Sequence, residues 1–299
     1  MPSSRTTRPS VSRLKQPLWR KVPATAGDVL QAARARLAST SQYPRRDAEL
    51  ILAHVLGCDP TALLTHPERL LSAQQAKQFE TLLKRRLASE PVQYLTGEQE
   101  FFGLLFEVSL DVLIPRPETE HLVEAVLERF DRDANPRIVD VGTGSGAIAV
   151  AIAHARTRAH VTGVDFYPNA LEVARRNAER HGVMDRITLR QADLLVEAGT
   201  AEFDVVVSNP PYIANDEKLE PQVANYEPRS ALYAGPTGLE VYERLIPQAN
   251  RALKPRGWLM MEIGYGQQPA LEALLGGWRE VSFVPDLQGI PRVVQAQKS

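Results

Sequence analysis

The sequence has little that could crosslink the chain, bind a metal ion or cross a membrane. Cys58 is the only cysteine among 299 residues, which excludes an internal disulfide and a cysteine metal cluster. The six histidines are scattered without the spacing of metal ligands, so we predict no metal site. No apolar run approaches the ~18 residues that a membrane helix requires, and we expect no membrane partner.

Neither charge is in excess, because 35 Lys and Arg residues stand against 36 Asp and Glu residues, for a formal net charge of −1. This balance argues against a protein that wraps DNA or RNA, and we expect no stable nucleic-acid binding. The first 24 residues differ, since they hold six basic residues and no acidic one. We interpret residues 1–24 as a basic disordered tail, although an organellar transit peptide has a similar composition. The expected compartment is the cytoplasm, with an organellar matrix as the alternative, and we expect a monomer.

The part of the chain that follows the tail shows two changes of periodicity. Residues 25–90 have apolar residues at helical spacing and predict a small all-helical domain of four or five short helices. Within it, Asp59 before Pro60 predicts a helix start, and the run from Ser72 to Gln75 fits a capping box. Residues 91–116 are then aromatic and apolar around a central glycine, which predicts a β-hairpin linker between two domains.

Residues 117–299 alternate between strand and helix patterns. Strands are predicted at 137–141, 160–165, 187–191, 203–208 and 258–263, and two more at 280–284 and 289–296 as an antiparallel pair. Helices are predicted at 146–156, 168–181, 239–253 and 267–275. This order predicts an α/β domain with a doubly wound, mostly parallel sheet of seven strands. A ligand site is expected at the carboxyl ends of its strands, near the topological switch point.

A glycine-rich loop, Gly142-Thr143-Gly144-Ser145-Gly146, leaves the strand predicted at 137–141. Gly142, Gly144 and Ala147 satisfy the relaxed dinucleotide fingerprint, and Asp165 ends the next strand, where an acid would meet a ribose hydroxyl. A nicotinamide dehydrogenase is therefore one interpretation of this loop. The third glycine, Gly146, favours another, because Asp-x-Gly-x-Gly-x-Gly resembles the first motif of class I S-adenosylmethionine-dependent methyltransferases.

The tetrapeptide Asn209-Pro210-Pro211-Tyr212 follows the strand predicted at 203–208. A planar NH2 group is a poor nucleophile, so its methylation requires acceptors that hold both N–H bonds in position. The side-chain oxygen of Asn209 and the backbone oxygen of Pro210 can supply them, and the adjacent prolines stiffen the loop. The Tyr212 ring can pack against the planar target. The motif therefore indicates methyl transfer to either adenine N6 or a glutamine side chain.

Two further acids lie in predicted strands and have open roles. Asp204, at the start of a strand, is either a charge at the strand entrance or a supporting group near the cofactor. Glu262, at the end of a strand, is a candidate to face the site.

The chain resembles the peptide chain release factor N5-glutamine methyltransferase family, also called HemK or PrmC, over nearly everything after the tail. The resemblance rests on the glycine loop, the Asn-Pro-Pro-Tyr-Ile run at 209–213, and the sequences at 94–97, 101–103 and 113–120. Arg-Pro-Glu-Thr-Glu at 116–120 is the most specific part. Sister enzymes that methylate a ribosomal-protein glutamine differ after the Pro-Arg, and nucleic-acid adenine methyltransferases share Asn-Pro-Pro-Tyr but not this N-terminal half.

The resemblance implies S-adenosyl-L-methionine as cofactor and class 1 peptide chain release factors as substrate, methylated on the glutamine of their Gly-Gly-Gln loop. The helical domain would contact the release factor outside that loop. The implied cofactor-binding residues are Gly142, Thr143, Gly144, Ser145, Gly146, Asp165, Asp193, Leu194 and Asn209. The implied catalytic residues are Asn209, Pro210 and Tyr212, and Pro211 and Arg116 join them in binding the substrate. Leu194 stands where the family often has an aromatic residue, so adenine is expected to pack on an aliphatic side chain.

Overall fold

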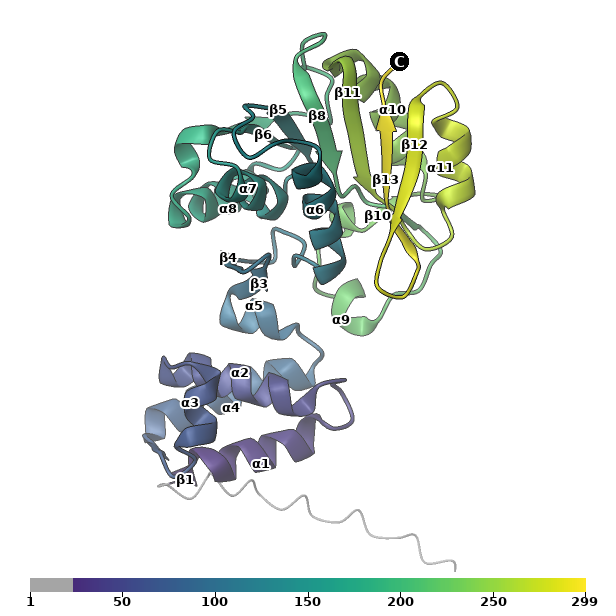
Figure 1. Ribbon diagram of the computed structural model, residues 1–299. Coiled ribbons are helices and arrows are strands. Elements are labelled where there is room, and N and C mark those ends of the chain that lie inside the picture. The colour runs from purple at the N-terminus through teal and green to yellow at the C-terminus, as the bar shows by residue number, and fades with distance from the viewer. Residues whose placement is uncertain (1–23) are drawn as a thin grey trace, which may run out of the picture. The chain divides into compact units, whose positions relative to one another are not determined.

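The computed structural model describes residues 24–299, so the predicted tail lies outside the described residues except for Ala24. The chain divides into two compact units, with the boundary between Thr96 and Gly97 (Figure 1). The helical pattern continues further than predicted, because Val92–Thr96 forms helix α5 inside the stretch interpreted as a hairpin linker.

The first unit is a group of helices around an apolar core. Its helices are α1 (Ala26–Leu37), α2 (Pro44–Leu56), α3 (Pro60–Thr65), α4 (Ala73–Leu87) and α5. The unit is not wholly helical, because strands β1 (Ala24–Thr25) and β2 (Leu70–Leu71) form a short antiparallel pair. Both predicted helix starts are confirmed: Asp59 caps α3, and Ser72 and Gln75 form a reciprocal capping box on α4.

A buried ion pair joins α2 to α4 in this unit. The Nε of Arg86 donates to Oδ2 of Asp47 at 2.6 Å, and the two side chains are only 5% and 9% exposed. The Ser41 hydroxyl donates to the same carboxylate oxygen at 2.7 Å. Because the pair is shielded from water, removing one partner leaves the other charge buried without compensation.

We expect Arg86→Leu to lower the free energy of unfolding of the helical unit by about 3–5 kcal/mol, because the carboxylate of Asp47 stays buried without its counter-ion. Thermal unfolding followed by far-UV circular dichroism would measure the change. Arg45→Leu is the matched control, since Arg45 pairs with Glu49 on the exposed surface of α2. That control should leave the unfolding midpoint unchanged, and an equal loss in both variants would contradict the prediction.

The predicted β-hairpin is confirmed as strands β3 (Glu98–Phe101) and β4 (Leu104–Glu107). It lies within the second unit, where it does not act as a free linker. Phe101 and Phe106 are almost fully buried and meet edge to face, with ring centroids 6.0 Å apart. They join the core formed by the sheet and its helices, which explains why the hairpin belongs to this unit.

The second unit contains the predicted seven-stranded sheet, in the order β12-β13-β11-β8-β5-β6-β7. Its strands are β5 (Arg137–Val141), β6 (His160–Asp165), β7 (Ile187–Gln191), β8 (Phe203–Ser208), β11 (Leu253–Glu262), β12 (Arg279–Pro285) and β13 (Pro291–Gln297). Strand β13 pairs antiparallel with both neighbours, and the pairs among the other central strands are parallel. β11 begins five residues before the predicted start, with an irregular register between Leu253 and Trp258.

Helices cover both faces of this sheet, as a doubly wound fold requires (Figure 1). Helices α6 (Glu120–Glu128), α7 (Ala147–Ala155) and α8 (Pro168–Arg180) share a core with Val205 and Val207 of β8. Helices α10 (Glu240–Ala252) and α11 (Gln268–Leu274) share a second apolar core, on the opposite face of the sheet, with Val206 of β8. Successive valines of β8 therefore point to opposite, equally buried faces, which is why Val205, Val206 and Val207 follow one another without a polar residue. Among residues 24–299, no helix has both the length and the apolar character to span a membrane.

Candidate active site

The two sequence motifs lie side by side at the topological switch point of the sheet. Val141, the last residue of β5, pairs with Val164 of β6 on one side and with Ser208 of β8 on the other. The segments that begin at Gly142 and Asn209 therefore leave neighbouring strand ends on the same edge of the sheet. This is where an open α/β sheet binds its ligands.

A cavity of about 270 Å³ opens at this edge. Seven of the predicted site residues line it, namely Gly142, Gly144, Asp165, Asp193, Leu194, Asn209 and Pro211. Thr143, Ser145, Gly146, Pro210, Tyr212 and Arg116 do not appear in its wall. The cavity therefore brings together residues from both sequence motifs, and the roles of the predicted residues in binding stay predictions.

Within the glycine loop, only the first two glycines face the cavity. Gly142 and Gly144 both have positive φ, and a Cβ on Gly142 would meet nothing within 4 Å. A Cβ on Gly146 would instead lie 3.1 Å from the Cβ of Ala174 in α8. The third glycine therefore permits the close approach of helix α8, and its predicted contact with the cofactor stays a prediction.

Thr143 and Ser145 are buried and stabilise the loop from beneath. The Thr143 hydroxyl donates to Oδ2 of Asp140 at 2.7 Å, and the Ser145 carbonyl accepts from Nδ2 of Asn177 at 2.9 Å. Burial raises the pKa of Asp140 to about 7, against the opposing effect of the Thr143 hydrogen bond. Both residues thus support the loop, and their predicted contacts with the cofactor stay predictions.

Asp165 is the principal charged group at the strand ends. Its Oδ2 accepts from the N–H of Gly144 at 2.9 Å, and its Oδ1 accepts from the N–H of Tyr167 at 3.0 Å. Burial raises the pKa of Asp165, and these backbone donors oppose the rise. Each carboxylate oxygen keeps a second lone pair, so Asp165 can still accept from ligand hydroxyls.

Aromatic side chains that the sequence reasoning missed lie on the same cavity wall. Phe166 and Tyr167 follow Asp165 directly, are 58% and 47% exposed, and meet edge to face with centroids 5.2 Å apart. Leu194 also lines the cavity, next to Asp193, which pairs with Arg244 at 2.5 Å. A planar ligand can therefore contact aromatic as well as aliphatic surface. Two aromatic residues directly after a strand-ending acid were the available signal.

The side chain of Asn209 is held by a chain of hydrogen bonds that leads away from the cavity. Its Nδ2 donates to Oγ1 of Thr119 at 3.1 Å. The Thr119 hydroxyl in turn donates to Oε2 of Glu262 at 2.6 Å. Thr119 belongs to the Arg-Pro-Glu-Thr-Glu run, so the most specific motif of the sequence contacts Asn209 through this residue.

Glu262, the candidate to face the site, does not line the cavity and is instead a buried carboxyl group behind Asn209. It is 3% exposed, and it accepts from the Tyr212 hydroxyl at 3.3 Å as well as from Thr119. Burial raises the pKa of Glu262 to about 7; the hydrogen bonds from Thr119 and Tyr212 oppose this, and the charge of Glu118 adds to it.

Tyr212 follows the residues that line the cavity and packs behind its wall. Its ring is half-buried and packs against the core that α10 and α11 share, and a Cβ on Gly264 would lie 3.0 Å from its Cδ2. Burial and the neighbouring carboxylate of Glu262 raise the pKa of Tyr212, so it stays a hydrogen-bond donor. Its ring thus supports the loop, and its predicted packing against the target group stays a prediction.

Arg116 also has a structural partner. Its guanidinium pairs with Oε1 of Glu227 at 2.5 Å, and the side chain of Glu227 is 1% exposed. The other carboxylate oxygen accepts from the N–H of Ile114 at 3.4 Å. Because Glu227 follows the Asn-Pro-Pro-Tyr motif by fifteen residues, the pair ties the segment after Asn209 to the segment before α6. This explains the arginine between two prolines, while its predicted contact with the substrate stays a prediction.

Asp204 lies at the far end of its strand from Asn209. Its carboxylate accepts from the N–H of Arg137 at 2.8 Å and pairs with Lys254 at 2.8 Å. The interpretation as a charge at the strand entrance is correct, and the one that placed it near the cofactor is wrong.

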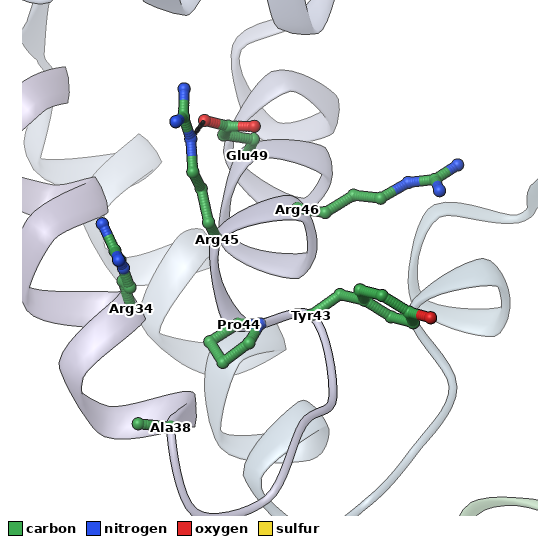
Figure 2. A pocket seen from close by; sticks show the side chains of 7 residues that line it. All are labelled: Arg34, Ala38, Tyr43, Pro44, Arg45, Arg46 and Glu49. Carbon is green, nitrogen blue, oxygen red and sulfur yellow. Dashed lines mark hydrogen bonds and ion pairs between the residues drawn. The ribbon is translucent and has the colours of Figure 1, made fainter.

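The helical unit has a hollow of its own, of about 420 Å³ (Figure 2). It is lined by Arg34, Ala38, Tyr43, Pro44, Arg45, Arg46 and Glu49. Arg45 pairs with Glu49 at 2.7 Å, and the side chains of Arg34, Arg46 and Tyr43 are exposed. The hollow is therefore a basic surface with an aromatic edge, and it contains none of the groups that a methyl transfer needs.

Two family models match the chain. The PrmC N-terminal domain matches residues 28–97, and the methyltransferase small domain matches residues 119–226. Among solved structures, the catalytic domain of hMettl16 in complex with MAT2A 3′UTR hairpin 6 has a TM-score of 0.52 and 19% identity. That match covers 77% of this chain and 84% of the other, and at this identity it bears on the fold alone. The fold and the motifs at its switch point define a class I methyltransferase.

Relatives of higher sequence identity show to which methyltransferase family the chain belongs. A release factor glutamine methyltransferase of Koribacter versatilis is 45% identical over 265 residues, which cover 87% of this chain and 94% of the relative. One of Geobacter sulfurreducens is 42% identical over 278 residues, with 90% and 95% covered. The chain belongs to the release factor glutamine methyltransferase family.

Proposed function

We propose that this protein transfers a methyl group from S-adenosyl-L-methionine to the side-chain nitrogen of the glutamine in the Gly-Gly-Gln motif of class 1 release factors. One observation supports this most strongly: Asn209 lines the same cavity as Gly142 and Asp165, so an amide held by Asn209 shares a site with the cofactor loop. Family membership supports the glutamine substrate over a nucleic-acid base. The cytoplasm is the proposed compartment, and a monomer the proposed state.

The residues of the cavity fit S-adenosylmethionine. Gly142 and Gly144 leave room for close approach to the backbone, and Asp165 retains lone pairs for ribose hydroxyls. Phe166 and Leu194 offer apolar surface for adenine. When bound, this cofactor supplies an electrophilic methyl carbon beside a sulfonium charge.

Asn209 and Pro210 act on the target amide by accepting hydrogen bonds from its two N–H groups. Oδ1 of Asn209 accepts one hydrogen bond and the backbone oxygen of Pro210 accepts the other, and together they orient the nitrogen lone pair. As positive charge develops on nitrogen, both carbonyl dipoles stabilise it without reorganising. The methylated nitrogen then loses a proton readily to water, so no strong general base is required. The neighbouring glycines of the substrate motif carry no side chains that would prevent entry into a narrow site.

We expect Asp165→Ala to weaken binding of S-adenosylmethionine by about 5- to 150-fold, which corresponds to ~1–3 kcal/mol for charge-assisted hydrogen bonds. Isothermal titration calorimetry with S-adenosylhomocysteine as a stable ligand would measure it. Asp204→Asn is the matched control, because this acid lies at the start of β8, at the opposite edge of the sheet from Asp165. The affinity of this variant should equal that of the wild type. Tight binding of NAD by the wild type, with no heat from S-adenosylhomocysteine, would overturn the cofactor assignment.

The substrate assignment is tested by incubating the protein with labelled S-adenosylmethionine and, in parallel, a purified release factor, ribosomal proteins, DNA and RNA. We expect label only in the release factor, mapped by mass spectrometry to the Gly-Gly-Gln peptide. Label in a ribosomal-protein glutamine would instead support the sister activity. Label in nucleic acid alone would support an adenine methyltransferase, which is the alternative that shares the Asn-Pro-Pro-Tyr motif.

We further propose that the helical unit recognises the release factor outside its Gly-Gly-Gln loop. The basic hollow of Figure 2 supports this, because exposed arginines beside an aromatic ring suit an acidic protein surface. Arg46→Glu should raise KM several-fold for an intact release factor and leave KM unchanged for a short Gly-Gly-Gln peptide. Arg158→Glu makes the same charge change on an exposed residue of the other unit and should affect neither KM.

A further inference from the structure

We propose that Thr119 and Glu262 are positioning residues that determine which atom of the Asn209 amide faces the substrate. This inference rests on the proposed role of Asn209 as an acceptor for the target amide. It assigns a purpose to the buried hydrogen-bond chain Asn209–Thr119–Glu262, whose members come from three separate segments of the chain.

The direction of this chain follows from the donors available. Above its pKa of about 7, Glu262 is ionised and can only accept, so the single O–H of Thr119 points to it, at 2.6 Å. The Thr119 oxygen then has only lone pairs to offer Asn209. It therefore binds the amide nitrogen Nδ2, at 3.1 Å, and the amide oxygen Oδ1 is turned away from Thr119.

This orientation decides what the site can hold. When Oδ1 faces the substrate, Asn209 accepts a hydrogen bond from a substrate N–H group and favours a side chain that ends in NH2. With the amide reversed, Nδ2 would confront the N–H bonds of a glutamine, and the site would favour a carboxylate instead. The difference between glutamine and glutamate therefore depends on a hydroxyl and a carboxylate that do not touch the substrate.

Burial makes the chain of contacts persistent. Thr119 and Glu262 are 4% and 3% exposed, so water does not compete for their hydrogen bonds. Glu262 also accepts from the Tyr212 hydroxyl, and Gln267 donates to the Tyr212 carbonyl at 3.0 Å. One carboxylate thus holds the Asn-Pro-Pro-Tyr segment at both ends, through Thr119 at Asn209 and directly at Tyr212.

Thr119→Val tests this role, because valine has nearly the same shape but lacks the hydroxyl. We expect single-turnover methylation of a release factor to slow by about 10- to 100-fold, as for a misplaced catalytic group, while the Kd for S-adenosylhomocysteine is unchanged. Thr119→Ser keeps the hydroxyl and should restore most of the wild-type rate. If Thr119→Val does not fold, Thr119→Ala removes the same hydroxyl without the extra methyl group and should show the same loss.

A double variant separates positioning from general structural damage. If Thr119 acts through Asn209, adding Thr119→Val to Asn209→Ala should cause no further loss of rate, whereas independent damage would multiply the two losses. Wild-type rates for Thr119→Val, or multiplied losses in the double variant, would overturn the inference. A wild-type protein that never methylates a release factor would overturn the proposed function instead, so the two failures are distinguishable.

Discussion

Asn209→Ala is expected to lower the rate of methyl transfer by about 10²–10³-fold, the cost of removing one preorganised acceptor from an active site. Asn209 lines the cavity with an amide whose nitrogen is already bound to Thr119, so its oxygen is the group available to the substrate. The Kd for S-adenosylmethionine should change much less than the rate. Single-turnover methylation of a release factor, alongside calorimetry of cofactor binding, measures both quantities.

Asn209→Asp is the companion variant for this prediction. It keeps an acceptor of the same shape but adds a negative charge beside the sulfonium, and it cannot donate to Thr119 when ionised. We expect tighter binding of S-adenosylmethionine without a gain in rate. Both variants should stay folded, because Asn209 lies in a loop at the strand end. Methyl transfer at the wild-type rate by Asn209→Ala would mean that the Asn-Pro-Pro-Tyr motif is only a turn.

Gly238→Ala is expected to damage both stability and catalysis, because this glycine lies against the backbone of the same motif. A Cβ at position 238 would lie 2.5 Å from the carbonyl oxygen of Tyr212, at a φ of +80°. The left-handed backbone costs ~1–2 kcal/mol for a non-glycine residue, and displacement of packed neighbours costs a further ~1–3 kcal/mol. Because Tyr212 must move, we expect the methyl-transfer rate to fall along with the free energy of unfolding.

Gly266→Ala is the matched control for that variant. Gly266 has a similar φ of +77°, but a Cβ there would meet nothing within 4 Å. It should therefore cost only the backbone strain and leave the rate of methyl transfer unchanged. Denaturant unfolding and single-turnover kinetics on both variants separate the two effects. Equal losses in the two variants would show that backbone strain, and not contact with Tyr212, accounts for the result.

Much of the second unit was predictable because local patterns report burial directly. Residues 203–208 read as a largely apolar run, and this is β8, whose three valines are buried on both faces. The two C-terminal strands were also predicted, and they pair antiparallel as expected. The start of β11 was missed because Lys254, Pro255 and Arg256 interrupt the apolar pattern where the strand is irregular.

Several side-chain roles were not predictable, because they depend on pairings between distant segments. Arg116 gave no sign of a partner in the sequence, and only the fold brought it to Glu227, 111 residues away. Gly146 gave no sign of a neighbouring helix, and only the fold brought α8 close to it through Ala174. A residue's type and spacing reveal its chemistry, but the partner that uses that chemistry is decided by which strands and helices become neighbours.

The sequence by itself determined the sheet, the edge at which the site lies, and the two motifs that meet there. Strand periodicity and glycine and proline spacing are local properties, and the order of elements restricts the ways in which they can pack. Only the tertiary structure decided how Asn209 is oriented, because Thr119 and Glu262 lie 143 residues apart and meet only when α6 packs against the sheet. Their hydrogen bonds to each other and to Asn209 depend on ångström-scale distances and on burial, which no local pattern specifies.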